Sequence, residues 1–377
     1  MKKILYFFPF NPIEKKDGSK TRALELLKYF KEKGFEVDFV YEKNLDNTLK
    51  HDEQILAKNL VSKIVSIQRR PNTISINYLI YKIDKIFFKK KTDITNFFFR
   101  RQFDKILRAN AYDYIIISYA IYANLISNKK TLKGAITIND THDFLASQIQ
   151  DKKKNRIGEY FQNEIKMLDK FDQVWAISND EYYIFSQFIN NVKLVPFSPT
   201  LSLEYTFSKR KTTFDIIYVA SENPHNIKSA KWFFEKVYPI LDQNFKILVI
   251  GKICKHILDY KNVAKINFVE DLSAEYLKSK ISICPMLTGT GVKIKVLEAL
   301  SFGLPIVTNL RGVDGLVNKS KNGCVVCANE IDFAKNIASL LNNELFFNEK
   351  SQEALDFFNT NYSKSIIYKN LDTIFLG

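Results

Sequence analysis

The sequence predicts an α/β protein made of two doubly wound domains, each built on a parallel sheet, that face each other across a cleft. Three observations support this fold. The chain has 377 residues, about twice the size of a typical domain. Short apolar segments alternate with amphipathic segments, as in parallel sheets that helices cover on both faces. Each half of the chain also opens with the same order of strand, loop and helix.

The first half starts with an apolar run at residues 2–8. We expect a strand here and not a signal peptide, because the run stops at Asn11 and no small-residue cleavage site follows. After a polar loop, residues 19–34 place apolar side chains at the spacing of an amphipathic helix. Further strands are predicted at 35–41, 112–118, 134–140, 173–178 and 192–197.

The second half opens with a predicted strand at 214–220, a polar loop and an amphipathic helix. Further strands are predicted at 246–251, 264–269, 281–286, 305–308 and 323–327. Residues 198–213 lack clear periodicity, hold Pro, Ser and Thr, and carry a basic run, so we place the linker there. The predicted domains are therefore 1–197 and 214–377, and the last helix could cross back to the first domain.

A glycine-containing turn joins the predicted strand at 281–286 to a helix that we expect to begin near Val292. Gly289, Thr290 and Gly291 form this turn, in which glycines permit positive φ and close approach of the backbone. The first amides of the helix present positive charge, so the unit is a predicted anion site. The order of residues matches neither a P-loop nor GxGxxG.

Gly291, Lys295 and Glu298 share one face of this helix. Lys295 could neutralise a diphosphate, and Glu298 could accept two hydrogen bonds from a ribose diol. Alternatively, Lys295 and Glu298 form an exposed i,i+3 ion pair that contributes only about 0.2–0.5 kcal/mol. The position at the carboxyl end of a strand favours a nucleotide, because ligands of doubly wound sheets bind there.

Several residues of the second half share the order and spacing of a known signature. They are Gly289, Gly291, Lys293, Lys295, Glu298, Gly303, Pro305, Gly312 and Gly315. This pattern closely resembles the C-terminal signature of nucleotide-sugar-dependent glycosyltransferases of the GT-B fold, and most of all the retaining family 4 group that builds bacterial surface polysaccharides. Asn226 with the Trp-Phe-Phe at 232–234, the Asp-Thr-His-Asp at 140–143 and the Ala-Ile-Ser at 176–178 resemble further landmarks of that group.

The resemblance implies two Rossmann-like domains and a nucleoside diphosphate sugar as the donor. Glu298 would bind the ribose, and Lys295 with the glycine turn would bind the diphosphate and the sugar. The donor-binding residues implied in this way are Gly289, Thr290, Gly291, Val292, Lys293, Lys295 and Glu298. The base would lie against a loop that contains Val269, Asp271 and Leu272.

In the first domain, the resemblance implies that His142, with Asp143 beside it, faces the donor sugar as a catalytic pair. A surface hydrogen-bonding cluster and a metal site formed by Asp140, His142 and Asp143 are the alternatives. Gly18, Ser19 and Lys20 are expected just before the first helix. The resemblance implies that they complete the cleft near the phosphates or the acceptor; alternatively, they only cap the helix.

Two positions depart from the family pattern. The usual second glutamate, eight residues before the ribose-binding one, is Thr290 here, so the contact with the donor sugar is in question. The usual Arg/Lys pair after the first strand of the second domain is reduced to Lys228, and Lys293 and Lys295 would supply the missing charge. We expect no metal or other cofactor, because GT-B enzymes generally stabilise the leaving diphosphate with helix amides and lysines.

The net charge of +15 is concentrated in residues 82–108, where basic residues are interleaved with Phe and Ile. This segment could be a solvated helix face, or it could bind an anionic membrane surface, where each lysine contributes roughly 1 kcal/mol. Nucleic acid is the least favoured partner, because no nucleic-acid motif accompanies the charge. No apolar stretch is long enough to span a membrane, which favours a cytoplasmic protein, with peripheral binding to the inner face of the cytoplasmic membrane as an option.

The predicted function is transfer of a sugar, with retention of configuration, from a nucleoside diphosphate sugar to a glycan or lipid-linked glycan acceptor. The product would belong to a bacterial surface polysaccharide such as capsule or lipopolysaccharide. Two alternatives stay open: a GT-B nucleotide-sugar epimerase, which would consume donor without acceptor, and a non-catalytic partner in polysaccharide assembly. The intact glycine turn and Glu298 favour an enzyme.

Overall fold

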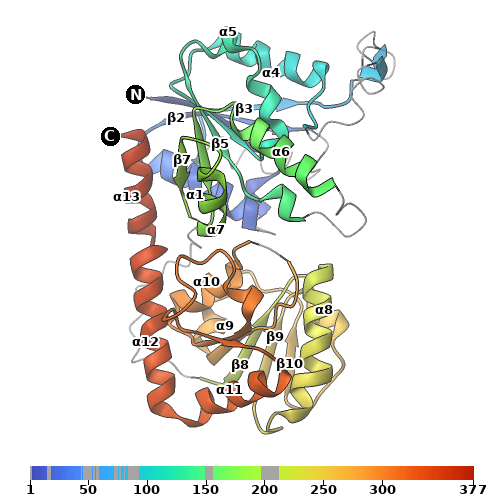
Figure 1. The fold of residues 1–377 in the computed structure, drawn as a ribbon, viewed down its shortest axis with the longest axis vertical. Coiled ribbons are helices and arrows are strands. Elements are labelled where there is room, and N and C mark those ends of the chain that lie inside the picture. Colours follow the sequence, from blue (N-terminus) through green and yellow to red (C-terminus); the bar gives the residue numbers. More distant parts are fainter. Residues whose placement is uncertain are drawn as a thin grey trace. The chain divides into compact units, whose positions relative to one another are not determined.

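The computed structural model describes residues 2–14, 18–43, 45, 53, 56, 59–71, 75, 78, 79, 81–83, 93–148, 156–196, 212–289 and 291–377. The chain divides into two compact units, Met1–Val195 and Pro196–Gly377. Each unit contains one parallel sheet with helices around it (Figure 1), so the predicted α/β class is confirmed. The predicted linker, apart from residues 212 and 213, lies outside the described residues.

The sheet of the first unit has seven strands in the order β3-β2-β1-β4-β5-β6-β7. Their bounds are β1 (Lys3–Phe7), β2 (Glu36–Glu42), β3 (Lys63–Ile67), β4 (Tyr114–Ser118), β5 (Ile136–Asp140), β6 (Gln173–Ala176) and β7 (Val192–Leu194). Every neighbouring pair is parallel; for example, Leu5 of β1 is paired with Asp38 of β2 and Ile115 of β4. The edge strand β3 was not predicted, because KIVSI mixes polar and apolar residues and is mostly only partly buried.

Helices of the first unit cover both faces of its sheet. They are α1 (Gly18–Glu32), α4 (Phe97–Ala109), α5 (Lys129–Leu132), α6 (Ile157–Leu168) and α7 (Asn179–Ser186), with short helical turns η1 (Pro12–Glu14), η2 (Ala120–Ile126) and η3 (Leu145–Gln148). Successive side chains of a strand point to opposite faces. Tyr6 accordingly packs on Phe30 of α1, whereas Phe7 packs edge-on against Phe99 and Phe103 of α4, with ring centroids 6.2 Å apart in both pairs.

The sheet of the second unit has six parallel strands in the order β10-β9-β8-β11-β12-β13. Their bounds are β8 (Phe214–Val219), β9 (Ile247–Ile250), β10 (Val263–Ile266), β11 (Ser279–Cys284), β12 (Ile306–Asn309) and β13 (Cys324–Cys327). Ile216 and Tyr218 of β8 belong to one buried cluster and Ile217 to another, so apolar cores lie on both faces of this sheet as well.

Helices α8 to α12 of the second unit contribute to these two cores, and α13 follows them in the chain. They are α8 (Pro224–Trp232), α9 (Ser273–Leu277), α10 (Ile294–Ser301), α11 (Glu330–Asn342), α12 (Glu344–Asn361) and α13 (Lys364–Phe375), with helical turns η6 (Phe233–Val237), η7 (Tyr238–Ile240), η8 (Lys252–His256) and η9 (Leu310–Val313). Within the described part of the chain, no helix combines the length and the apolar character that crossing a bilayer requires.

Part of the basic segment is an ordinary amphipathic helix. In α4, Phe99, Phe103 and Leu107 are buried in the core of the first unit, and Asn96 caps the helix by accepting a hydrogen bond from the amide of Phe99 at 2.8 Å. Phe99 and Phe103 therefore serve packing, whereas Phe97 is exposed, and the basic residues Arg101, Lys105 and Arg108 are exposed as well. Residues 84–92, which include Lys89, Lys90 and Lys91, lie outside the described residues.

Candidate functional site

The order of the strands selects one edge of each sheet as the place for a ligand. In the second unit the strand order reverses between β8 and β11, and the crevice at such a point lies beyond the carboxyl ends of the two strands. The loop after β8 leads into α8, and the loop after β11 leads through the glycine turn into α10. The predicted donor residues are therefore brought to the crevice, together with residues from α8.

The glycine turn has the backbone geometry that the sequence predicts. Gly289 and Gly291 have φ of +93° and +77°, a region that side chains disfavour. A Cβ on Gly289 would also lie 3.3 Å from Cγ of His225, so the imidazole would have to shift by a few tenths of an ångström to admit a side chain there. Thr290 lies outside the described residues.

The helix after the turn starts slightly later than predicted. Lys293 is its N-cap residue and Ile294 its first residue, whereas the sequence suggested a start near Val292. Lys293 folds back so that its Nζ donates to the carbonyl oxygen of Gly291 at 2.6 Å, and burial lowers the pKa of its ammonium group. Helix geometry leaves the first amides of α10 without partners inside the helix, and these amides lie at the crevice.

Lys295 is held by a residue of α8. Its Nζ donates to Oδ1 of Asn226 at 3.0 Å and lies 5.7 Å from the ring centroid of Tyr218. The amide of Asn226 is fixed in turn, because its Nδ2 donates to the carbonyl oxygen of Ser221 at 2.9 Å. Burial lowers the pKa of Lys295, which leaves a partly desolvated cation at the crevice.

Glu298 is held from the other side by α9. Its Oε2 accepts a hydrogen bond of 3.1 Å from the hydroxyl of Tyr276, and burial raises its pKa to about 7. Lys295 and Glu298 are both partly buried and each has a separate partner, so the alternative of an exposed ion pair between them is wrong. A cation and a carboxylate one turn apart on one helix face suit a ligand with an anion and a diol.

Sequence reasoning missed His225. Its Nδ1 lies 2.9 Å from Oγ1 of Thr288, and its ring packs against Gly289. The search for charge after β8 considered only Arg and Lys and found Lys228, which is exposed on the second turn of α8. The sequence signal that could have identified His225 is its position directly before Asn226, which resembles a landmark of the family.

The predicted base loop lies between β10 and α9. Val269 and Leu272 are partly buried against the core of the second unit. Asp271 accepts a hydrogen bond from the amide of Ser273 at 2.9 Å, which fixes the turn that leads into α9. Phe268, which the sequence analysis did not single out, is 80% exposed and is the outward-facing aromatic residue of this loop.

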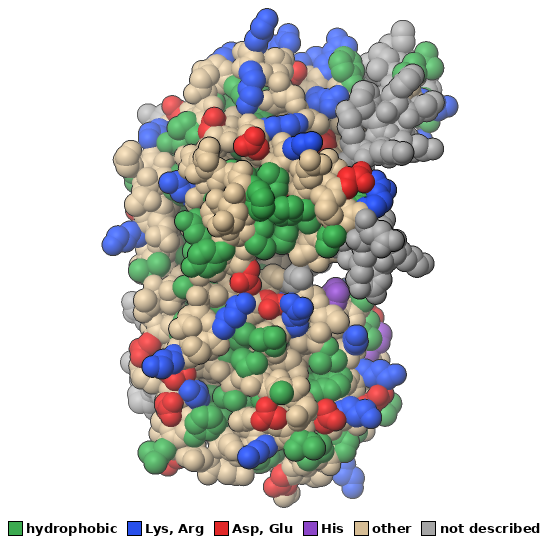
Figure 2. Space-filling model, in the orientation of Figure 1, with side chains coloured by type: hydrophobic (Ala, Val, Ile, Leu, Met, Phe, Trp, Pro, Cys, Tyr) green, Lys and Arg blue, Asp and Glu red, His purple; other side chains and the backbone are tan. Residues whose placement is uncertain are grey.

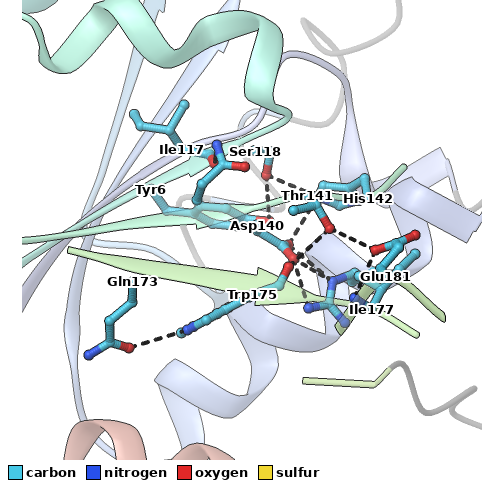
Figure 3. A network of polar contacts seen from close by, with 12 residues as sticks. Tyr6, Ile117, Ser118, Asp140, Thr141, His142, Gln173, Trp175, Ile177 and Glu181 are labelled. Carbon is cyan, nitrogen blue, oxygen red and sulfur yellow. Dashed lines mark hydrogen bonds and ion pairs between the residues drawn. The ribbon is translucent and has the colours of Figure 1, made fainter. Parts of the chain in front are cut away.

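In the first unit, a buried polar network surrounds the end of β5 (Figure 3). Asp140 is paired with Arg22 of α1, whose Nε lies 2.8 and 3.0 Å from the two carboxylate oxygens. His142 Nε2 lies 3.0 Å from Oδ2 of Asp140 and 3.1 Å from Oγ of Ser118, so Nε2 carries a proton toward the carboxylate. Burial alone would raise the pKa of Asp140, but Arg22 and His142 hold it below the ordinary value.

The imidazole of His142 is enclosed in this unit. Its side chain is only 1% exposed, and its ring is stacked on Tyr119 with centroids 4.6 Å apart. His142 and Tyr119 have φ of 59° and 66°, and such left-handed backbone at non-glycine residues is often found at functional sites. The alternative of a surface cluster is therefore wrong. Among the described residues, no group of three or more His, Cys, Asp or Glu side chains is arranged to hold a metal.

Two buried carboxylates brace the loop that carries His142 and Asp143. Glu181 accepts from Oγ1 of Thr141 at 3.0 Å, and Glu164 accepts from the amides of Leu145 and Ala146 at 2.8 Å. Burial raises the pKa of each glutamate to about 7. Asp143 itself accepts a hydrogen bond from Nε2 of Gln148 at 2.8 Å and is more exposed than His142.

The predicted phosphate or acceptor residues belong to α1 and not to the loop before it. Gly18, Ser19 and Lys20 are the first three residues of this helix. The side chain of Lys20 is buried, and its Nζ lies 6.0 Å from the ring centroid of Phe10. These residues follow β1, next to the point where the strand order of the first sheet reverses.

Comparison with known proteins agrees with the resemblance seen in the sequence. Residues 213–343 match the family model described as Glycosyl transferases group 1. A curated relative, an uncharacterized 44.6 kDa protein in the cps region of Klebsiella pneumoniae, is 27% identical over 164 residues. That match covers 39% of this chain and 42% of the relative, so the chain spans less than half of the relative's length.

Solved structures match over the full length of the chain. Sucrose-phosphate synthase from Thermosynechococcus elongatus has a TM-score of 0.72 at 13% identity, covering 100% of this chain and 98% of that one. HepE of Anabaena in complex with UDP-glucose has a TM-score of 0.70 at 12% identity, covering 99% of both chains. At such low identity these matches establish the fold. The chain therefore has the GT-B fold seen in these glycosyltransferase structures, and residues 213–343 match the model of the glycosyl transferases group 1 family.

Proposed function

We propose that this chain is a glycosyltransferase that moves a sugar from a nucleoside diphosphate sugar to a glycan or lipid-linked glycan acceptor. The family of residues 213–343 supports the reaction class, and the structure of HepE with UDP-glucose makes a uridine nucleotide the first donor to test. The relative from a cps region supports a role in surface polysaccharide biosynthesis. Retention of configuration and independence from a protein-bound metal belong to the proposal and rest on the family resemblance.

The arrangement around α10 carries this proposal. Lys295 and Glu298 lie on one face of the helix, each fixed by a side chain from another element, behind a turn in which Gly289 and Gly291 have positive φ. In the proposed complex, Glu298 accepts hydrogen bonds from the ribose diol. Lys295 and the first amides of α10 contact the diphosphate, with His225 beside them.

The proposed reaction separates charge at the diphosphate. The bond between the anomeric carbon and the phosphate oxygen breaks, and its electron pair goes to the phosphate. The acceptor oxygen then bonds to the same face of the sugar, and its proton passes to the departing phosphate oxygen. Lys295, Lys293 and the helix amides stabilise the negative charge of the leaving group, as fixed donors in a partly desolvated site do. A role of His142 in the reaction stays a prediction that rests on the family resemblance.

Binding of nucleotides tests the proposal directly. Thermal unfolding is measured with UDP, GDP and ADP and with their glucose derivatives, because a ligand at 100 times its Kd adds roughly 2.7 kcal/mol of stability. Calorimetry then compares Lys295→Ala and Glu298→Ala with Lys231→Ala and Glu235→Ala, which remove an exposed ion pair at the C-terminal end of α8. Unchanged binding in the first two variants would refute the site.

Product analysis tests the reaction. NMR of the glycosidic bond should show the anomeric configuration of the donor, and an inverted product would overturn retention. Consumption of the donor sugar in the absence of any acceptor, with formation of a free epimer, would instead favour an epimerase.

We also propose that the first unit associates with an anionic membrane surface. Lys and Arg side chains gather at the end of this unit where α4 and α5 lie (Figure 2). Arg101, Lys105 and Arg108 are exposed on the face of α4 opposite its buried phenylalanines. These residues form a surface that suits anionic headgroups.

A further inference from the structure

Tyr276 is a buried residue of α9 that touches the candidate site only through its hydroxyl group. Its ring has no exposed surface and is stacked on Phe302 with centroids 5.5 Å apart. Its oxygen lies 3.1 Å from Oε2 of Glu298 and 3.5 Å from the carbonyl oxygen of Lys295. The core of the second unit therefore fixes the ring, and the ring presents one polar atom to α10.

This contact determines how Glu298 can meet a ligand. A buried tyrosine hydroxyl needs a hydrogen-bond partner, and Glu298 supplies the nearer one. A carboxylate has about four acceptor positions, so one bond from Tyr276 leaves enough for the two hydroxyls of a ribose. With Oε2 held, the remaining positions of the carboxylate point in fixed directions.

The surrounding charges make the contact sensitive to pH. Burial raises the pKa of Glu298 to about 7, and the hydrogen bond from Tyr276 and the charge of Lys295 act against this rise. Cys284 of β11 is the other titratable group that acts on both Tyr276 and Lys295. On α12, which packs against α10, Lys350 and Glu353 pair with each other at 2.8 Å. Burial keeps the pKa of Tyr276 well above its ordinary value, so Tyr276 stays a donor near neutral pH.

We propose that Tyr276 is a positioning residue for the ribose-binding carboxylate, and that its hydrogen bond to Glu298 sets the pH range over which this chain binds a nucleotide. The inference rests on the proposed function. The ionised carboxylate has both oxygens available as acceptors for the ribose hydroxyls, whereas protonation turns one of them into a donor. Nucleotide affinity therefore falls as the pH falls through the pKa of Glu298. Loss of the tyrosine hydroxyl moves this fall to higher pH.

Calorimetric titration of wild type and Tyr276→Phe between pH 6 and pH 9 tests the inference, with UDP, GDP and ADP as ligands. If the pKa of Glu298 rises by about one in the variant, affinity is about fivefold weaker at pH 7, about tenfold weaker at pH 6 and within about twofold at pH 9. Tyr238→Phe is the matched control, because it removes a tyrosine hydroxyl bonded to Asn262 elsewhere in the same unit. We expect its pH profile to match that of wild type.

Glu298→Gln provides a second measurement that does not depend on the folding of Tyr276→Phe. Its nucleotide binding should be weak, and addition of Tyr276→Phe should weaken it no further at any pH. Because the terminal phosphate of each ligand also ionises at about pH 6, the comparison is between variants at the same pH. A loss caused by Tyr276→Phe that is as large in the Glu298→Gln background as in the wild type would overturn the inference, as would a loss in Tyr276→Phe of equal size at every pH. Binding of none of the three nucleotides by the wild type would refute the proposed function and this inference together.

Discussion

Substitution of Gly289 by alanine separates the role of the glycine turn in folding from its role in binding. Gly289 has φ of +93°, and its Cβ would lie 3.3 Å from Cγ of His225, tighter than ordinary contact. The left-handed backbone alone costs about 1–2 kcal/mol for a residue other than glycine. The contact with His225 adds to this cost or pushes the imidazole away from Thr288.

Gly34 supplies the control. Its φ is +74° and a Cβ there would meet nothing within 4 Å, so Gly34→Ala carries the backbone cost without a clash. Both variants should lower the unfolding temperature of the unit that contains them by roughly 2–8 °C in scanning calorimetry, since about 1 kcal/mol corresponds to 2–4 °C at this size. Only Gly289→Ala should also weaken nucleotide binding, by tenfold or more. Equal nucleotide affinity in Gly289→Ala and wild type would refute the placement of the diphosphate at this turn.

Three further predictions follow from single contacts. Asn226→Ala removes the partner of Lys295 and should weaken nucleotide binding about tenfold in calorimetry, since a hydrogen bond to a charged group contributes roughly 1.5–3 kcal/mol; an unchanged Kd would contradict the role of Asn226. Arg22→Ala leaves the buried carboxylate of Asp140 with His142 as its remaining ionisable partner and should destabilise the first unit by about 3–5 kcal/mol in denaturant unfolding, whereas Arg101→Ala on the surface should not. Because the pKa of Asp140 is lowered in the folded state, the stabilisation by this pair is present above about pH 4 and is lost as the pH falls further. Neutralising Lys89, Lys90, Lys91, Arg100 and Arg101 should weaken binding to anionic liposomes and reduce its salt dependence without changing nucleotide affinity; absence of liposome binding by the wild type would refute the membrane proposal.

The sequence predicts those parts of the site that depend on local order. The glycine turn, the helix after it and the common face of Lys295 and Glu298 follow from residues within a few positions of one another, and the structure has them as predicted apart from a later helix start. Alternation of apolar and amphipathic segments likewise identifies most strands of both sheets. The strand β3 escapes this pattern because an edge strand needs little apolar surface.

The partners of the site residues could not be predicted in the same way, because they come from distant parts of the chain. Asn226 lies 69 residues from Lys295, and Tyr276 lies 22 residues from Glu298. Arg22 lies 118 residues from Asp140 and looks in the sequence like any basic residue of an amphipathic helix. Each of these contacts exists only after the parallel sheet has brought its loops to one edge.

These distant partners also decide the charge of each carboxylate, which the residue type alone does not. Asp140 and Glu298 are both acidic residues near the carboxyl edge of a sheet, and burial by itself would raise the pKa of each. At Asp140 the guanidinium of Arg22 and the imidazole of His142 together outweigh burial, so the pKa is lowered, the carboxylate stays ionised and it serves as a fixed anchor. At Glu298 the neutral hydroxyl of Tyr276 and the more distant charge of Lys295 only partly offset burial, so its pKa is about 7. A carboxylate balanced in this way responds to the loss of one hydrogen bond, and for this reason the pH profile of Tyr276→Phe is a sharper test of the site than the loss of Glu298 itself.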